Sequence, residues 1–347
     1  MNMEIAIIGT QGSGKTTLFD VMTKGKGSRG KGFIDHVGKV FIPDDRVDRL
    51  SEIFNPAKTT YASFELFEFN GFGRLWREQN AGEIINALSG FDAFIHVVPD
   101  FEPFSAVDEF EEINLRLILS DLSLVSTQLK RLEKERKVRK ISDELIEVLR
   151  KLEDALSNEI PVWKVELSER EGELIRGYTF ATNRPRIVLL NQSEEKFTSG
   201  EVDSELERRL KESHMDYLRT CLTLEKEIVD LEKEERAEMF RAYGFERPTT
   251  DLLIQKIFGI LGYIVFFTAG EKEVRAWPIK KGSTARQAAG KIHTDMERGF
   301  IRAEVIGFDD FIKAGNIKKA KEMGLLRLEG KDYIVQDGDI IVIRFSR

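Results

Sequence analysis

The residues Gly-Thr-Gln-Gly-Ser-Gly-Lys-Thr at 9–16 have the types and spacing of a phosphate-binding loop. They match G-x-x-x-x-G-K-[ST] and follow the apolar run Ile-Ala-Ile-Ile at 5–8, so a buried strand should lead into a glycine-rich loop. Glycines let the backbone wrap around phosphate oxygens, and the N-terminus of the next helix adds partial positive charge. Lys15 would reach the β- and γ-phosphates, and Thr16 would offer its hydroxyl to Mg²⁺. The expected phosphate-binding residues are Gly12, Ser13, Gly14, Lys15, Thr16 and Thr17.

Alternating strands and helices over the first hundred residues would position this loop, and they predict an α/β fold with a mostly parallel sheet. The expected strands are Glu4–Ile8, His36–Ile42, Ala62–Phe69 and Ala93–Val98. The expected helices are Lys15–Thr23, Asp45–Ile53 and Gly82–Leu88. Glycines and basic residues alternate at 24–32, which fits either a nucleotide-sensing switch or a plain solvated loop.

Leucines and other apolar residues from Asn114 onward step by three and four, as on a coiled-coil seam. The basic run at 136–140 interrupts the seam, and a second seam follows at 145–156. Two seams with a short polar break predict an antiparallel helical hairpin inserted into the α/β domain. Its dense charge fits a solvated surface, or an arm whose tip at 134–140 contacts an acidic partner such as RNA.

The α/β pattern resumes after the hairpin and changes again near residue 264. Strands are expected at Arg186–Leu190 and Tyr217–Leu222, and helices at Glu205–Glu212 and Glu225–Ala242. The last part predicts a small α+β domain of short strands and one helix. The expected division is 1–113 and 178–263 for the nucleotide-binding domain, 114–177 for the arm and 264–347 for the last domain.

Composition limits the possible classes of protein. A chain of 347 residues predicts two or three domains, and its net charge of −7 gives no overall nucleic-acid signature. The single cysteine, Cys221, excludes an intramolecular disulfide and suits a reducing cytoplasm. No run of about 18 apolar residues is present, so we expect no membrane span. The expectation is therefore a cytoplasmic protein, taken as a monomer.

Four segments near the end of the chain carry a family resemblance. They are Arg-Ala-Trp-Pro-Ile-Lys-Lys-Gly at 275–282, Ala-Ala-Gly-Lys-Ile-His-Thr-Asp at 288–295, Gly-Phe-Ile-Arg-Ala-Glu-Val at 299–305 and Val-Gln-Asp-Gly-Asp-Ile-Ile at 335–341. With Phe-Phe-Thr-Ala-Gly at 266–270, they resemble the YchF / Obg-like ATPase family. The resemblance implies a P-loop GTPase-type domain interrupted by a coiled-coil arm, then a C-terminal TGS domain of β-grasp type. It also implies a ribosome or RNA partner.

The base-reading segment of the resemblance is Asn-Gln-Ser-Glu at 191–194. Related GTPases carry N-K-x-D there, and the Asp accepts two hydrogen bonds from guanine. The longer Glu194 does not fit that pairing, and the resemblance therefore implies ATP bound through Asn191 and Glu194. Leu222 belongs to the loop that would contact the base through its backbone. GTP remains the alternative nucleotide.

The sequence departs from the family where hydrolysis is concerned. Glu-Phe-Asn-Gly at 68–71 stands in place of D-x-x-G, so Glu68 would support Mg²⁺ through a water. No threonine of switch one is found at 24–37, and 99–112 lack the family's hydrolytic histidine. His96 is expected to be a satisfied core residue, which leaves Glu68 and Gln79 as the only catalytic candidates. Slow intrinsic turnover is therefore expected.

Together these features predict an ATP-binding regulatory protein that contacts the ribosome or RNA in a nucleotide-dependent way. Two alternatives stay open: a GTP-binding switch, and a nucleotide-stabilised RNA- or protein-binding module without useful turnover. The sequence contains no H-E-x-x-H motif, no paired cysteines and no G-x-S-x-G motif, so no motif suggests other chemistry.

Overall fold

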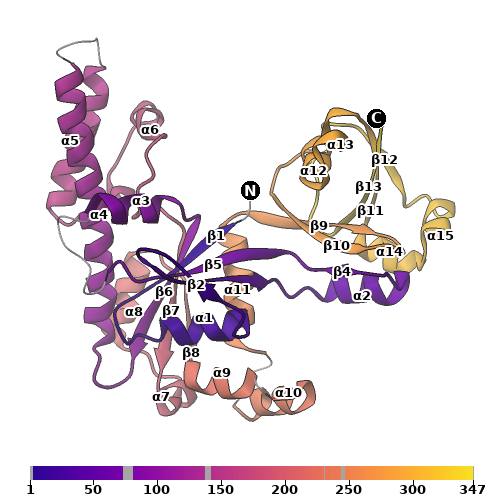
Figure 1. Cartoon of the computed structure of the whole chain (residues 1–347), viewed down its shortest axis with the longest axis horizontal. Helices are drawn as coiled ribbons and strands as arrows, with labels where there is room; N and C mark the ends of the chain where they lie inside the picture. The colour runs from indigo at the N-terminus through magenta and orange to yellow at the C-terminus, as the bar shows by residue number, and fades with distance from the viewer. Residues whose placement is uncertain (1–2, 73–80, 137–141, 230, 244–246, 347) are drawn as a thin grey trace. The chain divides into compact units, whose positions relative to one another are not determined.

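The computed structural model describes residues 3–72, 81–136, 142–229, 231–243 and 247–346. The chain divides into two compact units (Figure 1). Unit 1 comprises residues 1–39 and 65–250, and unit 2 comprises residues 40–64 and 251–347. Each unit contains its own sheet.

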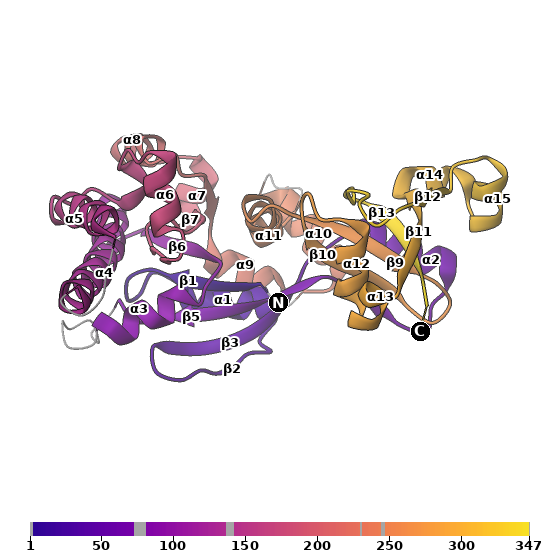
Figure 2. The ribbon, with the colours of Figure 1, turned by 90° about the horizontal axis from the view of Figure 1, so that it is seen from above.

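Unit 1 is built on a sheet with the strand order β2-β3-β5-β1-β6-β7-β8 among the described residues. The strands are β1 (Glu4–Ile8), β2 (Ser28–Arg29), β3 (Ile34–Phe41), β5 (Ser63–Phe69), β6 (Ala93–Asp100), β7 (Arg186–Gln192) and β8 (Tyr217–Thr220). The five neighbouring strands β5, β1, β6, β7 and β8 are parallel, whereas β2 pairs antiparallel with β3 at one edge (Figure 2). The predicted α/β fold with a mostly parallel sheet is therefore confirmed. Residues of β6 are buried along its whole length, as expected for a strand covered on both faces.

The helices that accompany this sheet are α1 (Lys15–Thr23), α3 (Ala81–Ser89), α7 (Glu194–Ser199), α8 (Ser204–Glu212), α9 (Leu222–Val229) and α10 (Lys233–Ala242). The single helix predicted over Glu225–Ala242 is wrong, because the structure has α9 and α10 there. The Arg236 guanidinium donates to the carbonyls of Val229 and Leu231, both at 2.9 Å. These bonds satisfy acceptors at the end of α9, where the helix leaves them without partners.

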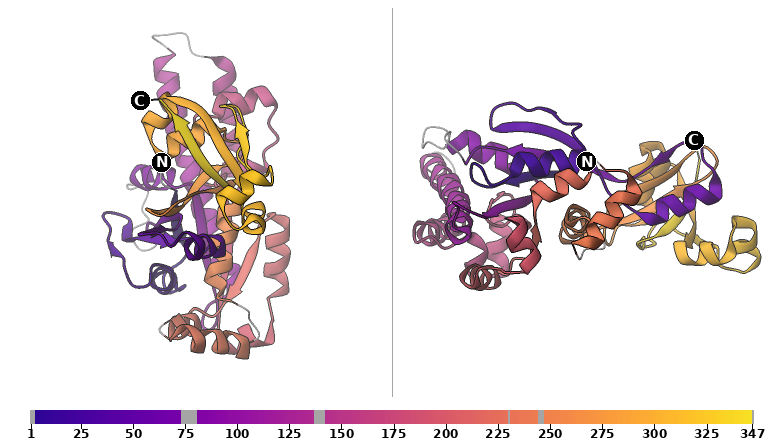
Figure 3. Two further views of the ribbon diagram at one scale, coloured as in Figure 1. Left: turned by 90° about the vertical axis from the view of Figure 1, so that its right-hand side faces the viewer. Right: turned by 90° about the horizontal axis from the view of Figure 1, so that it is seen from below.

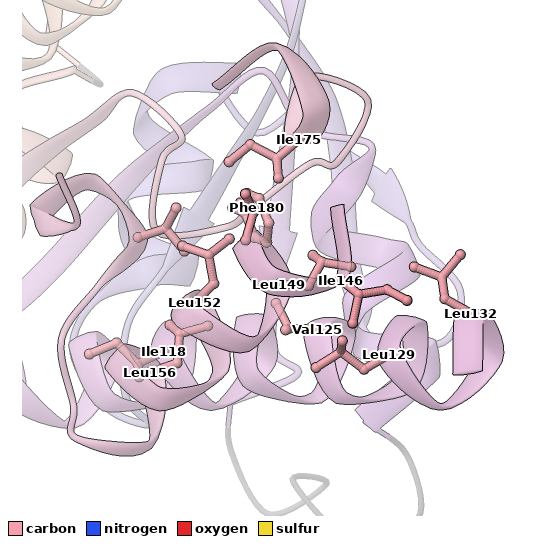
Figure 4. Close-up of a cluster of buried hydrophobic side chains, with 12 residues drawn as sticks. Ile118, Val125, Leu129, Leu132, Ile146, Leu149, Leu152, Leu156, Ile175 and Phe180 are labelled. Carbon is pink, nitrogen blue, oxygen red and sulfur yellow. The ribbon is translucent and has the colours of Figure 1, made fainter. Parts of the chain in front are cut away.

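The predicted hairpin consists of α4 (Ala106–Glu135) and α5 (Asp143–Ser157), which lie side by side in Figures 1 and 3. Helix α4 begins at Ala106 rather than at Asn114, because Ser105 caps it through the amide of Asp108. Figure 4 shows the leucine, isoleucine and valine side chains of the two seams packed together with Ile175 and Phe180. Residues 137–141, in the proposed basic tip, lie outside the described residues.

Asp121 fastens α4 to the segment that leads into β7. Its carboxylate accepts hydrogen bonds from the amide of Ala181 at 2.7 Å, and from the amide and hydroxyl of Thr182 at 2.9 and 2.6 Å. A short η2 turn (Val162–Lys164) and α6 (Glu169–Ile175) occupy the chain between α5 and this segment. The long insertion is thus anchored to the sheet domain at its base.

Unit 2 has a mixed sheet with the strand order β12-β11-β13-β9-β10-β4 among the described residues. Its strands are β4 (Thr59–Thr60), β9 (Tyr263–Ala269), β10 (Val274–Lys280), β11 (Phe300–Gly307), β12 (Arg327–Glu329) and β13 (Asp339–Phe345). Its helices include α2 (Asp45–Phe54), α12 (Ala285–Ile292), α13 (Thr294–Arg298), α14 (Phe308–Ala314) and α15 (Ile317–Glu322), and α11 (Thr249–Ile260) begins at the end of unit 1. The prediction of one helix in residues 264–347 is therefore wrong.

Residues 40–64 belong to unit 2 and not to the nucleotide-binding domain in which the sequence pattern predicts them. Phe54 of α2 stacks on the buried Phe311, with ring centroids 5.3 Å apart. The Arg46 guanidinium lies over the ring of Phe267 and donates to Asp337 at 2.7 Å. These partners are more than 200 residues away along the chain, so local patterns carry no sign of them. Within the described residues, no helix has the length and apolar character needed to cross a bilayer.

Candidate functional site

The loop 9–14 joins β1 to α1 in the conformation that its glycines require. Gly14 has φ +104°, and a Cβ atom there would lie 2.5 Å from the side-chain nitrogen of Asn191. Any other residue would therefore be strained and would clash. The backbone is held where a following helix N-terminus can receive an anion.

Lys15 is buried beside this loop and turns back onto it. Its ammonium donates to the carbonyl oxygens of Gly9 at 3.0 Å and Thr10 at 2.6 Å. Burial lowers the pKa of Lys15, and the carboxylates of Glu68, Asp35 and Glu109 oppose that shift. An ammonium bound to neutral carbonyl oxygens can exchange them for phosphate oxygens, which are stronger acceptors.

Two hydroxyl groups of the loop have no partner among the described residues. They are the buried hydroxyls of Thr10 and Ser13. Buried polar atoms are nearly always hydrogen-bonded, so such orphans mark a place where a ligand or water belongs. Phosphate oxygens are strong acceptors, and the donors of this loop fit them. Thr17 lies in the first turn of α1 beside them.

Thr16 and Glu68 are brought together, although they are far apart in sequence. The Thr16 hydroxyl donates to Glu68 Oε1 at 2.5 Å, and Glu68 is 2% exposed. A hydroxyl that donates its proton keeps its lone pairs, so Thr16 can still serve as an oxygen ligand of Mg²⁺. The donor set therefore fits the metal that a P-loop implies.

The other oxygen of Glu68 is taken by a residue that the sequence analysis did not select. His36 Nδ1, on β3, lies 2.6 Å from Glu68 Oε2. The periodicity of the strand gave no sign of this pairing, because it depends on the neighbouring strand.

Asn191 connects the phosphate loop to the loop at Leu222, which is the second loop expected to contact the base. Its Nδ2 donates to the Ser13 carbonyl at 2.9 Å, and its Oδ1 accepts the amide of Leu222 at 3.1 Å. Asn191 is 7% exposed. Asn191 thus joins the loop and Leu222 in one hydrogen-bonded structure.

Gln192 and Glu194, which follow Asn191 in the chain, have different hydrogen-bond partners. Gln192 Nε2 donates to the buried Asp100 and to the carbonyl of Glu201, both at 2.7 Å, and Lys196 donates to the same carboxylate at 2.6 Å. Glu194, the first residue of α7, is exposed and accepts the hydroxyl of Tyr243 at 3.1 Å. Glu194 therefore has an oxygen available to a ligand, whereas Gln192 is engaged within the protein.

The segment after β6 lacks the histidine that the family resemblance implies, and the ring of Phe104 from this segment lies near the phosphate loop. A Cβ atom on Gly12 would lie 3.0 Å from Cζ of Phe104, so this ring packs on the phosphate loop. Gln79, the other catalytic candidate, lies outside the described residues.

His96 is buried as expected, but the prediction that it is satisfied is wrong. Neither ring nitrogen has a hydrogen-bond partner among the described residues, and the ring stacks on Phe110 with centroids 5.6 Å apart. Burial, together with the charges of Arg186 and Lys15, puts the pKa of His96 well below its usual value. His96 is therefore a neutral core residue.

Comparison with known proteins identifies the family of this chain. The family model YchF-GTPase_C, described as a protein of unknown function, matches residues 263–346. Ribosome-binding ATPase YchF of Bacillus subtilis (strain 168) is 36% identical, and that of Escherichia coli O157:H7 is 35% identical; each alignment covers 100% of both chains. The structure of the Schizosaccharomyces pombe YchF GTPase matches with a TM-score of 0.83 at 24% identity, over 99% of this chain and 98% of that one. The chain therefore belongs to the YchF family.

Proposed function

We propose that this protein is an ATP-binding P-loop regulator that contacts the ribosome in a nucleotide-dependent way. The single observation that carries nucleotide binding is the joint between Asn191, the Ser13 carbonyl and the Leu222 amide. It ties the phosphate loop to the loops that would hold a base. The names of the relatives support both the ATP and the ribosome.

Phosphates would be held by the loop amides, Lys15 and the free hydroxyls of Thr10 and Ser13. Mg²⁺ would be held by the hydroxyl oxygen of Thr16, with Glu68 accepting the hydroxyl proton. The metal would neutralise charge on the phosphates. The residues of the chain bind and orient the nucleotide.

Glu194 and Tyr243 favour adenine over guanine. Guanine presents two donors side by side and needs both oxygens of one carboxylate. Oε1 of Glu194 also accepts the Tyr243 hydroxyl, so a guanine would have to share this oxygen with Tyr243. An adenine lacks the donor pair and loses nothing.

The ribosome contact would involve parts of the chain outside the nucleotide site. The four-part division stays our proposal, amended by residues 40–64, which pack in unit 2. The arm α4–α5 and the β-grasp sheet of the C-terminal TGS-type domain would contact the ribosome. The protein would be located in the cytoplasm. Monomeric behaviour is part of the same proposal.

Calorimetric titration of ATP and of GTP with Mg²⁺ tests the nucleotide part. ATP should bind in the micromolar range, about −8 kcal/mol, and at least tenfold more tightly than GTP. Lys15→Ala should abolish binding, and Lys211→Ala, which removes an exposed lysine on α8, should not change it. Equal ATP affinity in the Lys15→Ala variant would contradict the phosphate-loop assignment, and a preference for GTP would favour the GTPase alternative.

Co-sedimentation with ribosomes in ATP, ADP or no nucleotide tests the partner. Binding that depends on the nucleotide supports a regulator. Binding that is the same in all three conditions would favour the alternative of a nucleotide-stabilised module without a switch. The departures from the family motifs at 24–37, 68–71 and 99–112 keep this alternative open.

A further inference from the structure

His36, Glu68 and Thr16 form a chain of hydrogen bonds at the edge of the nucleotide site. His36 Nδ1 lies 2.6 Å from Glu68 Oε2, and the Thr16 hydroxyl lies 2.5 Å from Glu68 Oε1. The three residues come from β3, β5 and α1. The carboxylate is buried, whereas the His36 side chain is 37% exposed.

The chemistry of the carboxylate decides the direction of each bond. An ionised carboxylate only accepts, so Nδ1 of His36 carries the proton and donates it. Thr16 also donates, and both oxygens of Glu68 are therefore occupied. The orientation of the Thr16 hydroxyl, and hence of its lone pairs, follows from the position of this carboxylate.

Glu68 needs such a restraint more than a shorter residue would. A glutamate has one more rotatable bond than an aspartate, and hydrogen bonding by Thr16 alone leaves the other oxygen buried and unpaired. The ring of His36 is itself held, because it lies against Phe19 of α1 with centroids 5.5 Å apart. His36 thus fixes Glu68 through the carboxylate oxygen that Thr16 does not bond.

We propose that His36 is a positioning residue for Mg²⁺-dependent nucleotide binding and acts on Thr16 through Glu68. This inference rests on the proposed nucleotide function. Partners of this kind commonly affect metal affinity by 10- to 100-fold. Removing the donor should therefore weaken nucleotide binding in Mg²⁺ by about tenfold and leave binding in EDTA unchanged.

Two substitutions separate the hydrogen bond from the ring. His36→Phe keeps an aromatic ring against Phe19 and removes the donor. His36→Asn removes the ring, but its amide nitrogen can take the place of Nδ1. We expect weak Mg²⁺-dependent ATP binding by calorimetry for His36→Phe and binding close to that of the wild type for His36→Asn.

A double-mutant cycle with Glu68→Gln tests the route of the effect. If His36 acts through the carboxylate, adding His36→Phe to Glu68→Gln should have less than a threefold further effect. Additive losses would overturn the route. Wild-type affinity for His36→Phe, equal losses for Phe and Asn, or an equal loss in EDTA would each overturn the proposal while nucleotide binding by the wild type stands.

Nitrogen NMR of the histidines gives a readout that needs no nucleotide. The chain has four histidines, so single substitutions assign each signal. His36 should show the Nδ1–H form with a protected proton, and Glu68→Gln should alter it. A wild-type His36 in the Nε2–H form would overturn the inference even if a variant failed to fold. A wild type that binds no nucleotide would instead overturn the proposed function, and the inference with it.

Discussion

Replacing Asn191 by alanine should loosen the phosphate loop before any nucleotide is added. The substitution leaves the Ser13 carbonyl and the Leu222 amide without their partners. An unsatisfied buried backbone group costs about 1–3 kcal/mol, so the two groups together cost about 2–4 kcal/mol if water reaches them in part. This is a large share of the stability of a typical domain.

Hydrogen exchange measured by mass spectrometry locates that loss. Amides in peptides that cover 9–16 and 221–224 should exchange about 30-fold faster or more, since 1.4 kcal/mol corresponds to a factor of ten. Asn183→Ala is the matched control, because Asn183 is an exposed asparagine of the same unit. Asn191→Asp should give an intermediate result for Leu222 and a full loss at Ser13, since it keeps the acceptor and lacks the donor.

Unchanged exchange of the loop in a folded Asn191→Ala protein would refute this reasoning. It would mean that the loop is held by the backbone and by Lys15 alone. ATP affinity measured on the same samples then separates loop order from base contact. A variant that loses affinity without faster exchange would place Asn191 at the base and not at the loop.

Three further predictions concern other parts of the chain. Burial raises the pKa of Asp121 to about 6 from 3.8, so the folded state takes up the proton first and stability falls as pH rises through this range. Urea unfolding should show that the free energy of unfolding of the wild type, relative to that of Asp121→Asn, falls by about 2 kcal/mol from pH 4 to 7. A difference that does not change with pH would contradict the raised pKa. Arg46→Ala should lower the stability of unit 2 by about 1–3 kcal/mol, because it removes the bond to Asp337 and the contact with Phe267; calorimetric melting that leaves this unit unchanged would argue against a role for α2. Steady-state ATP hydrolysis by the isolated protein should stay below about 1 s⁻¹, and a faster rate would reveal a water-positioning group not yet identified.

Much of the fold could be predicted because its signals are local. The strand Glu4–Ile8, the loop and the helix Lys15–Thr23 have the predicted bounds, since an apolar run, a set of glycines and a 3.6-residue period each act over a few neighbours. The two seams of the hairpin followed from the same kind of periodicity. The start of α4 was missed because its cap, Ser105, precedes the seam.

The site could be predicted only in part. Motif and resemblance predict Lys15, Thr16 and Asn191, and the structure joins Asn191 to Leu222 and to the carbonyl of Ser13 in the same loop. Gln192 belongs to the same motif as Asn191, yet its amide donates to Asp100, a residue 92 positions away. A motif gives the order of residues along a strand but not which neighbour will claim each side chain.

What the sequence alone determined about this protein is the phosphate loop with the strand before it and the helix after it, and the inserted hairpin. These depend on residue type and spacing within a few turns of chain. The tertiary structure alone decided that His36 meets Glu68, that Asn191 holds Ser13 across 178 positions, and that residues 40–64 pack in unit 2. Asn191 reaches Ser13 because a parallel sheet brings the carboxyl ends of distant strands to one edge, and the other two contacts likewise join segments that no local period connects.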